Sequence, residues 1–342
     1  MTLREQNIRP ADLLAEYLRL NTEDGQNLLS KAGKMQNRPC PGCGIDDATL
    51  DFVKNGFTLV RCNGCDSLYV NPVPPEEAMA TFYRDSPSAD YWANVFFPAV
   101  AEARREPIYK PRAARINRIV KDNDIVPKQI IDVGAGAGLF LEEFSRLNPE
   151  VRIRAVEPGA AHAAGLRDKG FDIFEGYSDA AILQSDWKAS ADVVTCFEVL
   201  EHVSDPVSLF SDLCGLVRPG GLIVVSGLSG SGFDIQVLGK QSKPVSPPHH
   251  LTFLSIAGTQ VMIERCGLEL LSITTPGELD VDIVRNAALE DAECVGDPAI
   301  RRLILEVDDE ERQAFQEMLK NSCRSSHMWI VSRRPEEGAA KN

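Results

Sequence analysis

Four cysteines in two close pairs are the clearest chemical feature of the chain. Cys40 and Cys43 are two residues apart, and Cys62 and Cys65 repeat this spacing 18 residues later. Each pair lies on a glycine-containing turn, and thiolates are soft ligands that hold Zn²⁺ tetrahedrally when four of them converge. The spacing predicts a zinc ribbon, with a redox CxxC or an iron–sulfur site as the alternatives. With cysteine at all four positions, the predicted site is closed and structural.

A second chemical feature is the glycine-rich stretch "IIDVGAGAGLF" at residues 130–140. Its glycines permit a tight turn and let a ligand approach the backbone, and the helix that follows favours an anionic group at its start. Glu157 ends the next apolar run, 19 residues after Gly138. An acid at that place can accept hydrogen bonds from both hydroxyls of a ribose. The stretch therefore predicts a site for a ligand with a ribose and a polar tail.

Two cofactors fit this description. The dinucleotide fingerprint requires a third glycine where this chain has Leu139, so an NAD oxidoreductase is the less favoured alternative. The pattern G-x-G-x-G with an acid two residues before it resembles motif I of the class I S-adenosylmethionine (SAM)-dependent methyltransferases. The stretch "ADVVTCFEVLEHVSDPVSLFSDLCGLVRPGGLIVVS" resembles the fourth and fifth strands of the same superfamily. The resemblance covers residues 129–275 and is extended by the late strand "SHMWIVSRR".

The resemblance implies a set of cofactor-binding residues. The acid and glycines of motif I would face the methionine end of SAM, Glu157 would bind the ribose, and Tyr177, with Gly176, would lie near the adenine. His202 is expected to order its own loop. The full implied set is Asp132, Gly134, Ala135, Gly136, Gly138, Glu157, Pro158, Tyr177, Phe197 and Glu198.

Two adjacent histidines in "SPPHHLTFLS" supply the candidate catalytic groups. A ribbon followed by "LYVNPVPPEEAMATFY" and a SAM-type domain resembles bacterial zinc-ribbon methyltransferases of small-molecule biosynthesis, which include nucleotide-sugar C-methyltransferases. In those enzymes a His-Glu-His-Leu stretch carries a catalytic His and Glu. The alignment of motifs places His250 on the catalytic histidine and His249 where the family has Glu.

Methyl transfer from a sulfonium is an in-line displacement, so an enzyme mainly aligns the reactants and excludes water. A hydroxyl or acidic C–H nucleophile also benefits from a general base, a role that suits histidine. His250 and His249 are therefore the predicted catalytic residues. The alternative is a pair of loop histidines at the start of the helix near Ser255.

Two further clusters lie between the ribbon and the glycine turn. Aromatic residues there form either a lid over the substrate or ordinary helix-packing core. A local basic stretch is mostly a solvated helix face, although one or two of its members could pair with a substrate phosphate or carboxylate. The aromatic residues are Tyr83, Tyr91, Trp92, Phe96 and Phe97, and the basic ones are Arg104, Arg105, Lys110, Arg112 and Arg115.

The elements that must position these residues follow from the apolar pattern. From residue 129, short apolar runs alternate with helical stretches, which is typical of a parallel sheet covered on both faces. We therefore predict an α/β fold: a Rossmann-like class I methyltransferase sheet with helices on both faces, plus a small N-terminal zinc ribbon. The predicted segments are an N-terminal helical segment (1–36), the ribbon (37–75), a helical connector or lid (76–127), the methyltransferase domain (128–334) and a disordered tail (335–342).

Composition limits the partners. The formal net charge is −14, from 36 basic and 50 acidic residues. This disfavours the backbone of nucleic acids and anionic lipid. No apolar run approaches the length of a membrane span, and nine mostly scattered cysteines fit a reducing, cytoplasmic compartment. We expect SAM and structural Zn²⁺ as bound groups, a small-molecule substrate and no membrane. The alternatives are an RNA methyltransferase that grips RNA with its ribbon and a non-catalytic SAM-fold scaffold.

Overall fold

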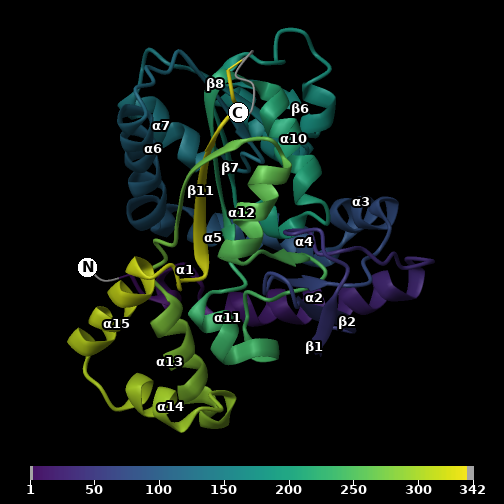
Figure 1. Ribbon diagram of the computed structural model, residues 1–342, viewed down its shortest axis with the longest axis vertical. Helices are drawn as coiled ribbons and strands as arrows, with labels where there is room; N and C mark the ends of the chain where they lie inside the picture. Colours follow the sequence, from purple (N-terminus) through teal and green to yellow (C-terminus); the bar gives the residue numbers. More distant parts are fainter. Residues whose placement is uncertain (1–2, 337–342) are drawn as a thin grey trace.

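The computed structural model describes residues 3–336, and its centre is a seven-stranded sheet of order β10-β11-β8-β7-β4-β5-β6 (Figure 1). Strands β4 to β8 pair in parallel, whereas β11 is antiparallel to β8 and to β10. This sheet confirms the predicted α/β fold. The strands are β4 Gln129–Val133, β5 Arg152–Glu157, β6 Asp172–Glu175, β7 Ala191–Phe197, β8 Val217–Leu228, β10 Glu269–Thr274 and β11 His327–Arg333.

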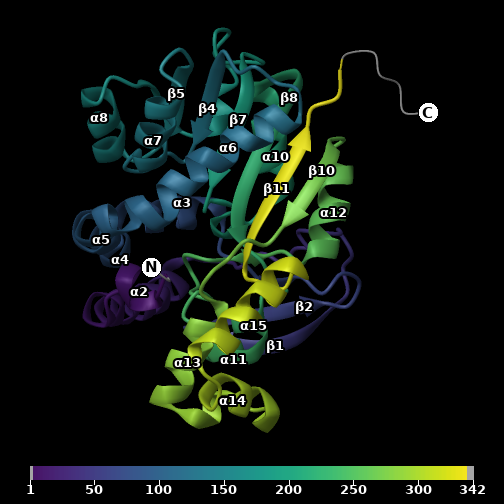
Figure 2. The same cartoon turned by 90° about the vertical axis from the view of Figure 1, so that its left-hand side faces the viewer.

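Helices cover both faces of the sheet (Figure 2). Apolar side chains of α6, α7 and α8 pack on one face, and those of α9, α10 and α12 pack on the other. Every residue of β7 is buried, which explains why its sequence is apolar on both faces. The helices are α6 Lys110–Asp122, α7 Leu139–Leu147, α8 Ala160–Asp168, α9 Ser178–Ala181, α10 Pro206–Leu216 and α12 Ile256–Arg265.

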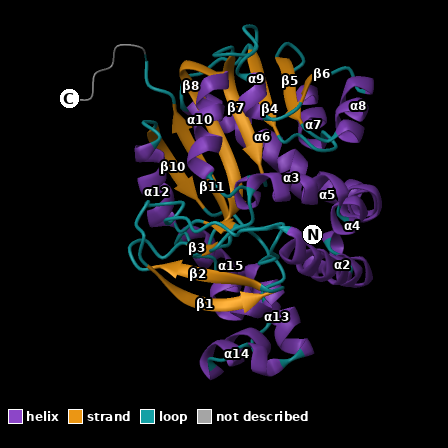
Figure 3. Ribbon diagram, turned by 90° about the vertical axis from the view of Figure 1, so that its right-hand side faces the viewer, coloured by secondary structure: helices purple, strands orange, loops and turns teal. Residues whose placement is uncertain are grey.

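A second, four-stranded sheet has the order β1-β2-β3-β9 and lies below the large sheet in Figure 3. β1 (Ala48–Lys54) and β2 (Phe57–Cys62) form a hairpin that is closed by the Asn55-Gly56 turn, in which both residues have positive φ. β3 (Leu68–Val70) continues it. The last strand, β9 (Thr252–Phe253), comes from beyond β8, directly after the histidine pair. The histidine loop is thus fixed to the cysteine-containing sheet.

The N-terminal helices and a helical insertion enclose this region. α1 (Glu5–Ile8) and α2 (Ala11–Lys31) lie beside α3 (Glu76–Asp85), α4 (Pro87–Tyr91) and α5 (Phe97–Arg104). Between β10 and β11 the chain forms α13 (Asp280–Glu290), α14 (Pro298–Leu305) and α15 (Asp309–Asn321), which pack with α11 (Phe233–Leu238) around a core of their own (Figure 1). Pro335 and Glu336 of the predicted tail are exposed, and the remaining tail residues lie outside the described part.

Candidate active site

The glycine turn connects β4 to α7 at the carboxyl edge of the sheet. Gly134, Gly136 and Gly138 have φ of +75°, +53° and +77°, a region that side-chain-bearing residues rarely adopt. A Cβ on Gly134 would lie 2.5 Å from Val199 Cγ2, whereas a Cβ on Gly136 would meet nothing within 4 Å. Ala135 and Gly136 are both partly exposed on this turn. The turn therefore offers bare backbone at Gly136 to a ligand.

Glu157 lies at the end of β5, next to this turn. Its side chain is buried, with Oε2 accepting a hydrogen bond from Gly136 N at 2.8 Å and Oε1 accepting one from Gly159 N at 2.8 Å. A carboxylate oxygen has a second lone pair, so both oxygens can still accept hydroxyl donors. The geometry suits the ribose role expected of Glu157. Pro158, the next residue, is exposed.

Asp132 lies below the turn, in the last part of β4. Thr195 Oγ1 donates to Asp132 Oδ1 at 2.6 Å, and the residue is only 3% exposed. Burial raises the pKa of Asp132 to about 7, although the hydrogen bond from Thr195 acts in the opposite direction. A carboxyl group with this pKa can accept or donate a hydrogen bond near neutral pH.

Phe197 ends β7 and Glu198 follows it, but the two side chains face different surroundings. The Phe197 ring is buried against Phe140 and Trp329, with the Arg112 guanidinium 4.5 Å from its centroid. This ring belongs to the core of the α6–α7 face, where it supports the turn from behind. Glu198 is held with φ of +56°. The backbone thus turns sharply between the two predicted cofactor residues.

Three side chains hold Glu198, and sequence reasoning did not assign them. Ser226 Oγ, His327 Nε2 and Arg112 Nη2 lie 2.6, 2.8 and 3.1 Å from Glu198 Oε1. Burial alone would raise the pKa of Glu198, but His327 and Arg112 hold it below its usual value. The positions of Arg112 in the basic stretch and of His327 at the start of a late strand gave no local signal for this contact.

The histidine pair splits between two environments. His249 is 5% exposed, with its Nε2 2.9 Å from Ser88 Oγ and its ring against Tyr17 and Phe82. Burial lowers the pKa of His249 well below its ordinary value, and the proximity of His202 and His250, which would repel a second positive charge once protonated, acts in the same direction. The side chain of His249 therefore lies in the packing between α2, α3 and α4.

His250 faces the loop after β7 instead. Its Nδ1 lies 2.6 Å from the carbonyl oxygen of Pro244, an acceptor, so Nδ1 carries the proton and Nε2 has the free lone pair. Its ring packs edge-on against His202, with centroids 4.7 Å apart. Burial lowers the pKa of His250 to about 4. His250 is thus a neutral acceptor at physiological pH.

His202 and Glu201 complete this cluster. Ligand atoms of Glu201, His202 and His250 all lie within 4.8 Å of one another, and such a set can hold a divalent transition metal. His202 Nδ1 lies 3.3 Å from the Tyr83 hydroxyl, which donates to the carbonyl oxygen of His249 at 2.9 Å. Burial lowers the pKa of His202 to about 3 and raises that of Glu201. His202 therefore does more than order its own loop, because it connects that loop to the histidine pair.

Comparison with known proteins decides the family. Residues 102–273, about half of the chain, match the family described as the methyltransferase domain. The chain belongs to this family. A ubiquinone biosynthesis O-methyltransferase from Xanthomonas euvesicatoria pv. vesicatoria is 25% identical over 182 residues, which are 51% of this chain and 76% of that protein. The corresponding enzyme from Cupriavidus pinatubonensis is 33% identical over 123 residues, 35% of this chain and 49% of that protein.

A solved structure supports the fold of this methyltransferase. The plantazolicin methyltransferase BamL, crystallised with a triazolic desmethylPZN analog and S-adenosylhomocysteine (SAH), matches 75% of this chain and 94% of its own with a TM-score of 0.50. Its sequence identity is 10%, so the likeness concerns the fold. The predicted class I, SAM-dependent methyltransferase is confirmed by these comparisons together with the family match.

The four cysteines of the methyltransferase converge as expected of a metal site. Their Sγ atoms all lie within 4.8 Å of one another, with 3.5 Å between Cys40 and Cys65 and 3.5 Å between Cys43 and Cys62. Tetrahedral Zn–S bonds of about 2.3 Å place sulfurs a little under ~4 Å apart. The donor set therefore fits Zn²⁺. The nine cysteines of the chain are all free thiols.

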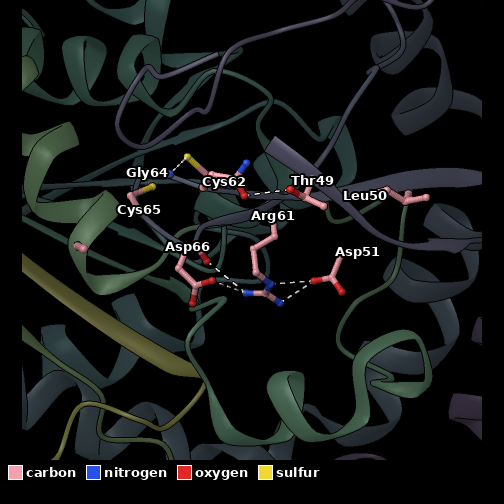
Figure 4. A pocket seen from close by; sticks show the side chains of 10 residues that line it. Thr49, Leu50, Asp51, Arg61, Cys62, Gly64, Cys65 and Asp66 are labelled. Atoms are coloured by element: carbon pink, nitrogen blue, oxygen red, sulfur yellow. Dashed lines mark hydrogen bonds and ion pairs between the residues drawn. The ribbon is translucent and has the colours of Figure 1, made fainter. Parts of the chain in front are cut away.

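A hollow of about 610 Å³ lies beside this cysteine site (Figure 4). Arg61 lies in its wall, but Asp51 and Asp66 flank its guanidinium at 2.8 and 3.5 Å. The other two basic residues of the ribbon are also occupied, since Arg38 donates to Val70 O and Lys54 donates to Ser242 O. The positively charged side chains of the ribbon thus all make contacts within the protein.

In the part of the chain that the structure describes, no helix has the length and apolar character needed to cross a membrane.

Tyr177 completes the set of predicted residues. It precedes α9 and is 59% exposed. Gly176, before it, has φ of +153° and lies against the Phe174 ring. The exposed ring of Tyr177 is free to cover a ligand at the edge of β6, the side on which the adenine is expected.

Proposed function

We propose that this methyltransferase transfers a methyl group to an oxygen atom of a small molecule, with His250 receiving or orienting the hydroxyl proton. The observation that carries the proposal is the tautomer of His250. Because Nδ1 donates to Pro244 O, the basic Nε2 is directed away from that contact and is available to an acceptor hydroxyl. The named O-methyltransferases among the relatives support oxygen as the acceptor atom.

SAM, when bound, supplies an electrophilic methyl group on a good leaving group. The chain has to hold it and align the acceptor in line with the carbon–sulfur bond. We assign the ribose hydroxyls to Glu157 and the methionine end to the Gly134–Gly138 turn and Asp132, which fits the bare backbone at Gly136 and the free lone pairs of Glu157. Pro158 and Glu198 would border this site, the Phe197 ring would pack in the core beside it, and Tyr177 would cover the adenine.

The low pKa of His250 defines how it would act. A weak base is a poor acceptor of a proton before reaction, but it can accept a hydrogen bond from the hydroxyl and take the proton as the new bond forms. Removal of a proton from carbon demands more of a base. His249, which replaces the family's Glu, is buried against Tyr17 and Ser88. This placement favours O-methylation over C-methylation and a role for His249 in packing.

The nucleotide-sugar acceptor expected from the resemblance stays a prediction within this proposal.

We further propose that the four cysteines hold a structural Zn²⁺. Its function would be indirect: the ribbon sheet ends in β9, only two residues after His250, so a folded ribbon fixes the position of the candidate base. The occupied basic residues of the ribbon support an architectural function rather than RNA binding.

Two measurements test the proposal. Calorimetry with SAH should show binding to the purified protein. Absence of SAH binding would contradict the proposal and support a non-catalytic SAM-fold scaffold. Methyl transfer from labelled SAM to a panel of catechols, phenols, hydroxy acids and nucleotide sugars should then give an O-methylated product by mass spectrometry and NMR. Product methylated only at carbon would contradict the proposal.

A further inference from the structure

Arg38, at the start of the ribbon, reaches both of the loops that bring the candidate base into place. Its Nη2 donates to the carbonyl oxygen of Leu251 in the histidine loop at 2.9 Å, and its Nη1 donates to that of Ser204 in the loop after β7. Its Nε and Nη2 also donate to Val70 O in β3, at 3.2 and 3.1 Å. A single guanidinium therefore joins three separate elements: the ribbon, the histidine loop and the loop after β7.

On the histidine loop, Arg38 holds the residue that directly follows His250. The carbonyl oxygen of this residue, Leu251, accepts from Arg38, and its N–H donates to the carbonyl oxygen of Glu201 at 2.7 Å. Leu251 itself is buried. The backbone next to the candidate base is thus fixed from two sides, by the ribbon and by the loop after β7.

On the loop after β7, Arg38 holds the backbone just beyond His202. Ser204, which accepts from Nη1, is two residues after His202. The buried Thr252 hydroxyl makes a second link, since its Oγ1 donates to Val203 O at 2.8 Å and accepts from Nη1 and Nη2 of Arg38 at 3.3 Å. The loop that carries His202 is therefore tied to the ribbon through the same guanidinium.

The chemistry of arginine explains how one side chain can make all these contacts. The hydrogen bonds that the structure records for the Arg38 side chain all go to carbonyl or hydroxyl oxygens. A guanidinium presents five N–H donors in one rigid plane, whereas the ammonium of lysine is a point charge on a flexible stem. The Tyr69 ring lies beside this plane, with its centroid 5.4 Å from Cζ. Arg38 can therefore fix three backbone segments at set positions relative to one another.

Strand pairing alone does not set the position of the two loops. β9 pairs with β3 through only two residue pairs, and the short helix η3 (Leu200–His202) of the other loop belongs to neither sheet. The rings of His202 and His250 nevertheless lie edge-on, with 4.7 Å between their centroids. This arrangement needs a tie between the loops, and the Arg38 contacts provide one.

We infer that Arg38 is a positioning residue of this methyltransferase, which holds both loops against the ribbon and so keeps the His250 imidazole oriented toward the acceptor hydroxyl. The inference rests on the proposed function, in which His250 is the candidate base. Displacement of a reacting group by about 1 Å can cost ~10²-fold in rate, so a residue that fixes the loop can matter without touching the substrate. The Arg38 contacts involve none of the residues assigned to the cofactor, and SAM binding should not depend on them.

Nuclear magnetic resonance of the SAH-loaded protein, with ¹⁵N-labelled histidine, tests the inference. In the wild type we expect neutral His250 to carry its proton on Nδ1, as the 2.6 Å contact with Pro244 O requires. Arg38→Ala should shift the imidazole signals of His202 and His250 and reduce the Nδ1–H form of His250. The signals of His162, on α8, should not change. A residue that only stabilises the fold would lower the unfolding midpoint without changing the tautomer in the folded protein.

Two further variants and a rate measurement sharpen the test. Arg61→Ala is the matched control, because Arg61 belongs to the same ribbon but pairs with Asp51 and Asp66, and it should leave all imidazole signals unchanged. Arg38→Lys should restore the wild-type signals only in part. With the acceptor that the substrate panel identifies, kcat/KM should fall by roughly 10- to 100-fold in Arg38→Ala, while SAH affinity stays within a few-fold.

Unchanged His202 and His250 signals in folded Arg38→Ala would overturn the inference, as would equal changes in Arg61→Ala. If Arg38→Ala does not fold, Thr252→Val decides the question, because it removes the hydroxyl that links Arg38 to Val203 O. It should shift the same signals by less, and no shift would overturn the inference. Absence of SAH binding in the wild type refutes the methyltransferase site, whereas intact SAH binding with unchanged imidazole signals refutes only the positioning role.

Discussion

The cofactor side and the acceptor side of this methyltransferase are built in different ways. The cofactor side is compact in sequence: Asp132, the glycine turn and Glu157 lie within a single strand–helix–strand unit, and Glu157 is bonded directly to the turn. The acceptor side joins α3, the loop after β7 and the histidine loop, which are far apart in the chain. The cofactor side is therefore formed locally at the edge of the sheet, whereas the acceptor side forms only when separate layers of the fold pack together. Disturbing one side should therefore leave the other largely intact.

Loss of the proposed zinc ligands should have the largest effect. Cys62→Ser removes one of four thiolates, and structural zinc contributes about 10 kcal/mol or more to the folding of such modules. Because β9 ends the ribbon sheet, we expect loss of bound zinc by elemental analysis and loss of nearly all turnover, with SAH affinity changed much less. Cys323→Ser is the matched control, as Cys323 lies outside the cysteine cluster. An equal loss of SAH affinity would break the distinction between the two sides.

Removal of the candidate base comes next. His250→Ala should lower kcat by ~10²-fold or more, because the acceptor hydroxyl loses its proton acceptor. SAH affinity should stay within a few-fold of the wild type. A full rate in His250→Ala would remove this residue from the mechanism.

The reverse pattern is expected on the cofactor side. Glu157→Gln keeps the shape but removes the charge that binds the turn and that we propose binds the ribose, so SAH affinity should fall by roughly 10- to 100-fold in calorimetry. Rates at saturating SAM should be less affected. Glu175→Gln, at the exposed end of β6 where Glu175 pairs with Arg167, should bind SAH normally. Unchanged affinity in Glu157→Gln would refute the ribose assignment.

Acid should weaken the acceptor side through its histidines. The pKa of His202 is lowered to about 3 by burial, so below the ordinary value of about 6.5 the unfolded chain binds a proton that the folded chain does not. The free energy of unfolding contributed by this residue therefore decreases as the pH falls from about 6.5 toward 3. Denaturant titrations of the wild type and His202→Asn should show a steeper decline with acid for the wild type. Parallel curves would contradict the burial of a neutral His202.

The smallest effect concerns Tyr177. Since the ring is 59% exposed, Tyr177→Ala should weaken SAH binding by only a few-fold. Competition with adenosine measures the adenine contribution directly. A loss as large as that of Glu157→Gln would show that the ring closes over the cofactor and would extend the cofactor side beyond its local unit.

The parts that could be predicted are those whose chemistry is carried by local spacing. The two Cys pairs predict a four-thiolate site because each pair lies on one short turn. The glycines and Glu157 predict a cofactor site because they belong to one strand–helix–strand unit. The sequence placed Phe197 at the carboxyl end of a strand, but it could not show that the ring packs into the core. It also gave no sign of the contacts that His202 makes with Tyr83 and His250, because these residues come from other parts of the fold.

The sequence by itself thus determined the α/β sheet, the cysteine cluster and the family. Alternating apolar runs and short motifs each span only a few consecutive residues, so they can be recognised without knowledge of the tertiary structure. Only the tertiary structure decided how the adjacent His249 and His250 divide between core and site. It also brought His327, 129 residues along the chain, to Glu198, and Arg104 to the residue before Arg9. Such contacts depend on how layers dock, and the pattern of any one segment does not encode them.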